Sequence, residues 1–155
     1  MIIDNNLIVS GTSAANVITG QTVTGSSAVL SANTIDLGQN RDIGQGNDLL
    51  KGRVEVVTAF AGLTALTVEA IQADDAALSS NVTVIGSSGA IPVASLTAGA
   101  RFAIELNPRI GSVGQRYLGL RYTPTGTGTA GAVFGDFGAE YQGGQKTYPG
   151  GFSVL

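Results

Sequence analysis

Three carboxylates that lie within seven residues are the first candidates for chemistry in this chain. They are Glu69, Asp74 and Asp75 in the stretch TVEAIQADDAALSSNVTVIGSSG at 67–89, and the whole chain has eleven acidic residues. Two carboxylates can act as general acid and base, or can bind a divalent cation, when a cleft holds them at the right separation. The alternative is structural, because Asp is favoured at turns and helix N-caps, where it accepts backbone N–H hydrogen bonds.

The rest of the composition removes most other catalytic and metal chemistry. The chain has no histidine and no cysteine, which excludes Ser-His-Asp and Cys-His catalysis, thiolate zinc sites and disulfides. A hydrolase that uses Asp and Glu alone remains as the enzyme hypothesis. A calcium loop needs oxygen ligands at alternating positions, whereas ADDAALSS offers an adjacent pair. We therefore expect no enzyme activity, no catalytic residue, no metal and no cofactor.

The positions of the other charged residues favour ion pairs between strands. Glu69 and Glu105 fall on the outward side of alternating segments, and Arg53, Arg101 and Arg121 fall on the same kind of face. Opposite charges that face one another across neighbouring strands stabilise a sheet. We expect Asp74-Asp75, where the alternation stops, to form one short helical turn that reverses the chain.

Alternation of apolar and polar residues with period two predicts six strands and an all-β fold. In LTVEAI, for example, Leu66, Val68 and Ala70 alternate with Thr67 and Glu69. Short strands separated by glycine-rich turns are typical of an antiparallel jelly roll or β-sandwich, which we predict here. The predicted strands cover residues 53–59, 66–71, 82–85, 101–106, 117–122 and 133–141, and the predicted turns lie at 61–63, 86–89, 97–99, 107–111 and 123–131.

The string GTGTAG at 126–131 matches the G-x-G-x-x-G pattern of dinucleotide-binding loops. Such a loop must be followed by a helix. The next residues, AVFGDFGAEY, alternate like a strand. We interpret the match as coincidental and the string as a hairpin loop.

The length of 155 residues predicts a single domain with two less regular ends. We expect an extended arm with edge strands over 1–50, a core sandwich over 51–141, and a glycine-rich tail over 142–155. Apolar residues in such arms often become ordered when they dock on a partner.

Low charge is the most unusual property of the composition. Charged residues make up 12% of the chain and the net charge is −3, against about 25% charged residues in a typical globular domain. The basic residues are scattered singly, so we expect no nucleic-acid partner. The start, MIIDNNLIVSG, lacks the features of a signal peptide, and no apolar run has the length of a membrane span. A surface of small, uncharged side chains instead favours a protein that assembles with other subunits, which then cover that surface.

Three blocks of sequence carry a resemblance to a known family. They are NTIDLGQNRDIG at 33–44, TVEAIQADDAALSSNVTVIGSSGAIPVASLTAGARFAIEL at 67–106 and QRYLGLRYTPTGTGTAGAVFGDF at 115–137. Over roughly residues 30–137 the chain resembles the capsid cement, or decoration, proteins of tailed phages of the short-tailed Bordetella type. The end, EYQGGQKTYPGGFSVL, is longer than the plain terminal strand of that family.

The resemblance implies a jelly-roll structural protein that binds the outer surface of the expanded major-capsid shell. Its partners would be the major capsid protein and itself, as a homodimer or trimer, and its location the virion after synthesis in the bacterial host cytoplasm. The alternative is a carbohydrate-binding β-sandwich of a phage particle, with Tyr117, Tyr148 and Phe152 as platforms for sugars. The candidate interface residues are apolar or aromatic and lie near the ends of the chain: Ile2, Ile3, Leu7, Ile8, Phe134, Tyr148 and Phe152.

Overall fold

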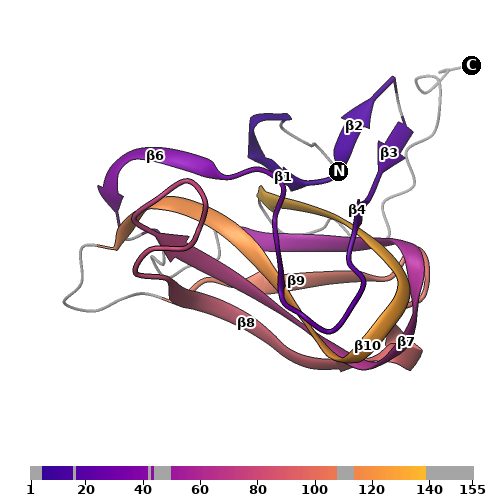
Figure 1. Cartoon of the computed structure of the whole chain (residues 1–155). Coiled ribbons are helices and arrows are strands. Elements are labelled where there is room, and N and C mark those ends of the chain that lie inside the picture. The colour runs from indigo at the N-terminus through magenta and orange to yellow at the C-terminus, as the bar shows by residue number, and fades with distance from the viewer. Residues whose placement is uncertain (1–4, 16, 42, 44–49, 108–113, 139–155) are drawn as a thin grey trace, which may run out of the picture.

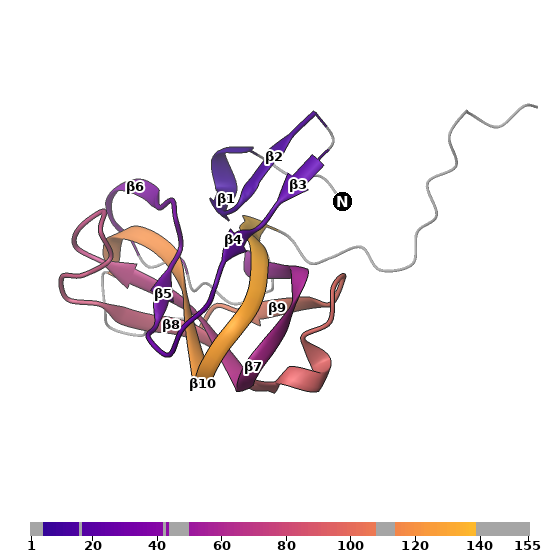
Figure 2. The same cartoon turned by 45° about the vertical axis from the view of Figure 1, so that its right-hand side comes forward.

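Two long antiparallel strands form the framework of the structure. β7 (Lys51–Ala73) and β10 (Gln115–Gly138) pair from one end to the other, with Tyr117 opposite Ala73 and Gly138 opposite Lys51. Both views show the two strands side by side along a shared bend (Figures 1 and 2). The computed structural model describes residues 5–15, 17–41, 43, 50–107 and 114–138.

The shorter strands line the two outer sides of this pair. β8 (Thr83–Pro92) pairs with the C-terminal half of β7, and β9 (Arg101–Glu105) pairs with its N-terminal half. The free side of β10 pairs antiparallel with four short strands, which are β1 (Ile8–Ser10), β4 (Gln21–Thr22), β5 (Val29–Leu30) and β6 (Ile35–Arg41). Two 3₁₀ turns, η1 (Asn5–Leu7) and η2 (Val93–Ser95), complete the sheet's connections.

A separate hairpin lies outside this eight-stranded sheet. β2 (Thr12–Ala14) pairs antiparallel with β3 (Val17–Thr19) in a two-stranded sheet of its own. In Figure 2 the hairpin extends from the end of the molecule opposite the bend of β7 and β10. The described residues contain no α-helix, and the antiparallel all-β prediction is confirmed. The jelly-roll connectivity stays a prediction.

Each long strand folds back on itself and contributes to two layers. The hydroxyl of Tyr122 and a methyl group of Leu120 lie within 3 Å of the space that a side chain at Gly135 would occupy. Residues 13 positions apart in a straight strand would be about 40 Å apart, so β10 must turn through the bend between them. The pairing of β10 with β7 shifts register four times between Thr125 and Val133, which is where the bend lies.

Glycine makes this bend possible. Gly131 has φ +149°, and a Cβ there would lie 2.3 Å from the Phe60 ring on the paired strand. Gly62, which lies in the same bend on the paired strand β7, has φ +85°. Local irregularities such as β-bulges shift the register and bend a strand without ending its pairing, so both strands continue through the turn.

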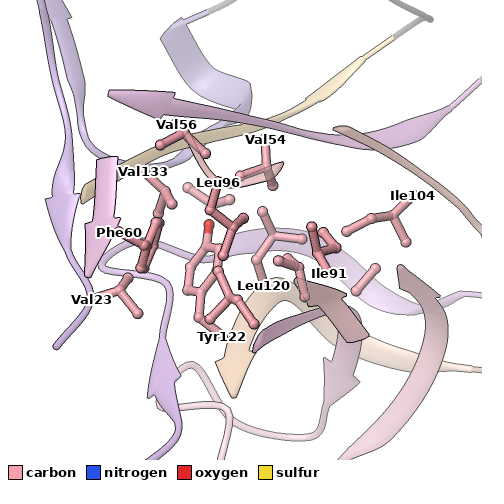
Figure 3. Packing of buried hydrophobic residues seen from close by; sticks show 14 of the residues in the cluster. Val23, Val54, Val56, Phe60, Ile91, Leu96, Ile104, Leu120, Tyr122 and Val133 are labelled. Atoms are coloured by element: carbon pink, nitrogen blue, oxygen red, sulfur yellow. The ribbon is translucent and has the colours of Figure 1, made fainter. Parts of the chain in front are cut away.

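The core fills the space between the layers. Figure 3 shows the buried side chains pointing toward one another around the ring of Tyr122. They come from both halves of β7 and β10 and from the shorter elements, as with Leu66 and Val133, which are 1% and 0% exposed. The predicted alternation is confirmed where it matters for this core: Leu66, Val68 and Ala70 are buried while Thr67 and Glu69 are half-buried.

The predicted strand boundaries are wrong at the bend. The segments 53–59 and 66–71 belong to the single strand β7, and the segments 117–122 and 133–138 belong to β10. The glycine-rich string at 126–131 lies inside β10, so it is not a hairpin loop, although the prediction that no helix follows it is confirmed. The string at 86–89 similarly lies inside β8.

The turns predicted at 97–99 and 107–111 remain to be compared with the structure. The turn at 97–99 is confirmed, because the N–H of Ala100 donates to the carbonyl of Thr97 at 3.0 Å. The turn predicted at 107–111 falls mostly outside the described residues.

Gly135→Ala is expected to destabilise the protein by about 2 kcal/mol or more, because overpacking of a core costs about 1–3 kcal/mol and the new methyl also displaces Tyr122. The hydroxyl of Tyr122 donates to Ser10 on β1 at 2.8 Å, so its displacement also weakens the attachment of β1. The measurement is urea unfolding of Gly135→Ala in the wild-type and Tyr122→Phe backgrounds. The loss should be smaller in the second background, and equal losses would contradict the assignment of this space to the Tyr122 hydroxyl.

Candidate functional site

Opposite charges meet across neighbouring strands on the outward faces of the sheet. Arg121 on β10 lies opposite Glu69 on β7 in the strand register, and its Nε donates to Glu69 Oε2 at 2.7 Å. Arg101 on β9 lies opposite Glu55 and donates from Nε at 2.9 Å. The predicted cross-strand ion pairs are confirmed for Glu69, and also for Glu105, which lies 3.7 Å from the ammonium of Lys51.

One of these cross-strand pairs is buried. Arg53 and Asp136 are register partners on β7 and β10, and their side chains are 5% and 1% exposed. The guanidinium binds the carboxylate with two hydrogen bonds, one of them from Nε to Oδ1 at 2.9 Å. Gly138 leaves room for the guanidinium, since a Cβ there would lie 2.7 Å from Arg53 Cζ. The expectation that Arg53 is an outward, exposed residue is therefore wrong.

An exposed ion pair joins β6 to β10. Arg116 binds both carboxylate oxygens of Asp36 at 2.7 Å, and both side chains are 44% exposed. The Arg116 hydrogen bond, together with the N–H of Gly38, lowers the pKa of Asp36 to about 2. The same guanidinium lies 5.2 Å from the centre of the Tyr117 ring, a cation–π contact.

The Asp74-Asp75 stretch is a structural corner between β7 and β8. The carboxylate of Asp75 accepts hydrogen bonds from the hydroxyl of Ser79 at 2.6 Å and from the N–H groups of Ser79 and Ser80 at 2.8 Å. The Ser79 hydroxyl, followed by these N–H groups, lowers the pKa of Asp75. The chain reverses through a turn in which the N–H of Leu78 donates to the carbonyl of Asp75, and Leu78 has φ +54°. The predicted reversal is therefore present, but it is not helical.

Most charged side chains among the described residues are therefore paired with an opposite charge of the same chain. Five ion pairs include ten charged side chains, and the described charged residues outside these pairs are Arg41, Asp74 and Asp75. Within the described ranges, no three His, Cys, Asp or Glu side chains gather as metal ligands. None of the helices described in the structure is long and apolar enough to cross a membrane.

An open depression of about 390 Å³ lies between β7 and β10 in the described part of the chain. It is lined by two register pairs, Thr67 with Thr123 and Glu69 with Arg121, and by Ala28. These groups offer hydrogen bonds to a polar ligand. The lining has no second carboxylate, so it lacks the pair that acid–base catalysis by carboxylates requires.

Two of the seven candidate interface residues are buried within their own chain. Phe134 is 1% exposed, because the connection at Gly11 lies against its ring, and the expectation that it lies on an outer face is wrong. Ile8 is 7% exposed in β1, whereas Leu7 is half-buried. The other four candidates, Ile2, Ile3, Tyr148 and Phe152, lie outside the described residues.

The β2–β3 hairpin is the surface feature that the sequence did not predict. Val17 in β3 is 62% exposed, the largest exposure of a bulky apolar side chain among the described residues, and Val84 in β8 follows at 42%. A signal was present: from Asn5 to Ile35 the chain contains no charged residue and no proline. The sequence predicts an extended arm with edge strands over residues 1–50, and it does not predict a separate hairpin.

Comparison with known proteins gives one family. A family model described as Bbp16 matches residues 17–136, about three quarters of the chain. No curated protein matches the chain at a significant level.

Asp136→Asn is expected to destabilise the protein by about 3–5 kcal/mol, because it leaves the buried Arg53 charge without its counter-charge. Asp36→Asn is the matched control, since Asp36 also binds an arginine with both oxygens but at the surface, and it should change stability little. Urea denaturation measures both. Similar losses of unfolding free energy in the two variants would contradict the prediction that the buried ion pair matters more than the exposed one.

The pKa of Asp36 gives a second prediction. Its folded pKa of about 2 lies below the ordinary aspartate pKa of 3.8, so the stability that this group contributes is complete above about pH 4 and is lost as the pH falls toward 2. The measurement is a pH titration of the Asp36 carboxyl carbon by NMR. Arg116→Gln should raise the midpoint, whereas Arg121→Gln, which removes the partner of Glu69, should not.

Proposed function

Because the chain belongs to the Bbp16 family, which points to a Bordetella phage protein, we propose that it is a structural capsid decoration, or cement, protein. It binds the outer surface of the expanded major-capsid shell and stabilises that shell by bridging capsomers. It is not an enzyme, and its partners are the major capsid protein and further copies of itself, as a dimer or trimer. Its location is the virion.

The observation that carries this proposal, beside the family, is the neutralised and low-charge surface. Among the described residues, five of the six arginine and lysine side chains are matched to carboxylates in ion pairs. Such a surface has little attraction for nucleic acid or for small anions. Its small uncharged side chains cost little to desolvate when another protein covers them.

Stabilisation of a shell by such a protein follows from mass action. A protein that binds the expanded shell and not the free subunits lowers the free energy of the assembled state. When each copy contacts two or more capsomers, many weak contacts act together through high effective concentration. The contacts need no strong individual site, which agrees with the open form of the depression over Thr67 and Arg121.

The carbohydrate-binding alternative receives no support from the described surface. Sugar sites commonly stack a ring on an exposed aromatic side chain, and no aromatic side chain is among the exposed bulky apolar residues of the described ranges. Tyr117 is half-buried against Ile71, Ala73 and Leu78 and under the guanidinium of Arg116. The other two proposed platforms lie outside the described residues.

The test is co-sedimentation of the purified protein with expanded and unexpanded shells of the major capsid protein of the same phage. Expanded shells should bind the protein and gain thermal stability, and unexpanded shells should not. Because the interface has few unpaired charges, affinity should change by less than about threefold between about 0.05 and about 0.5 M NaCl. Absence of binding to expanded shells at micromolar concentration would refute the proposal.

A further inference from the structure

The β2–β3 hairpin has the properties of a strand pair that is completed by another protein. Each strand is three residues long and pairs with its neighbour on one side, while neither belongs to the main sheet. None of its strand residues is buried. Isolated two-stranded hairpins are marginally stable in water, so a hairpin that extends from the molecule (Figure 2) gains stability from any surface that covers it.

The backbone of the hairpin turn adds to this instability. Ala15, the first residue after β2, has φ +49°. A residue with a Cβ in this left-handed region costs about 1–2 kcal/mol relative to the right-handed one. The strain is retained although few contacts from the described part of the chain support the hairpin.

The hairpin lacks the charged residues and the proline that protect many exposed strand edges, although its strands are short, which also limits edge pairing. Natural proteins protect such edges with lysine, other charges, proline or bulges, because an open edge pairs readily with another chain. The segment from Asn5 to Ile35 contains none of the four charged residue types and no proline. Its most exposed bulky side chain, Val17, is β-branched and therefore suited to a further strand pairing.

These properties also restrict the chemistry of the partner. No cation is available in the hairpin for phosphate groups, so nucleic acid and anionic lipid headgroups are disfavoured. A single exposed valine is too small an apolar area for a membrane surface. Open backbone groups beside small uncharged side chains are complementary to the edge of another uncharged strand, the arrangement called β-augmentation.

We propose that the β2–β3 hairpin docks on an exposed, uncharged strand edge of a shell subunit and extends that subunit's sheet. This inference rests on the proposed function and identifies the surface that carries it. The hairpin, rather than Phe134 or the ion-paired faces of β7 and β10, then forms the contact with the shell.

The experiment compares two equivalent substitutions at the two most exposed valines, Val17→Lys and Val84→Lys. A lysine at position 17 places an unpaired charge in the docked strand pair, so binding to expanded shells should weaken at least about tenfold. Val84→Lys introduces the same charge on β8 and should bind like the wild type. Both positions are exposed, and thermal unfolding checks that both variants fold.

A second variant keeps the test independent of Val17. Ala14→Lys changes the register partner of Val17 on β2, which is also exposed, and it should weaken shell binding in the same way. If the wild type binds shells and the two hairpin variants bind equally well, the docking inference is wrong while the proposed function stands. If the wild type itself does not bind, the proposed function fails.

Sedimentation of the free protein tests whether the hairpin pairs with a second copy of this chain instead of with a shell subunit. If Val17→Lys dissociates an oligomer of this chain in the absence of shells, the hairpin pairs with a second copy, and the shell assignment is overturned. An unchanged oligomeric state together with weaker shell binding supports the proposal.

Discussion

The pairing of β7 with β10 around a common bend positions the other strands of the main sheet. Both strands continue through the bend, so each contributes one half to either layer and the core forms between the halves of the same two strands. The bend needs glycine where the strands come closest, since a side chain at Gly131 would overlap the Phe60 ring. The shorter strands add to edges that this pair has already placed.

The same pairing determines where the charges lie. Antiparallel register places Arg121 opposite Glu69 and Arg53 opposite Asp136, so ion pairs form between strands rather than with solvent. The buried pair is costly to desolvate and is retained by two hydrogen bonds and by the space at Gly138. As a result, few charged side chains in the described part of the chain lie outside an ion pair.

The sequence predicted which side chains of a strand point into the core better than it predicted where the strands begin and end. Alternation correctly assigned Leu66, Val68 and Ala70 to the core, and it placed Glu69 and Glu105 where cross-strand pairs form. Asp74-Asp75 was correctly predicted as a corner, although it is a hydrogen-bonded turn and not a helical one. These properties depend on neighbours one or two residues away, so they are visible in a single sequence.

The pattern of residues along the chain is enough to predict the all-β class and the inward or outward direction of most strand residues. The composition also excludes chemistry that needs histidine or cysteine. The folded structure was needed to show that glycine-rich strings such as 126–131 bend a strand instead of ending it, because a turn and a bulge use the same residues. It also decided that Phe134 and Asp136 are buried and that Val17 is exposed. Burial depends on which distant segment lies above a residue, and the local pattern of a strand carries no record of that segment.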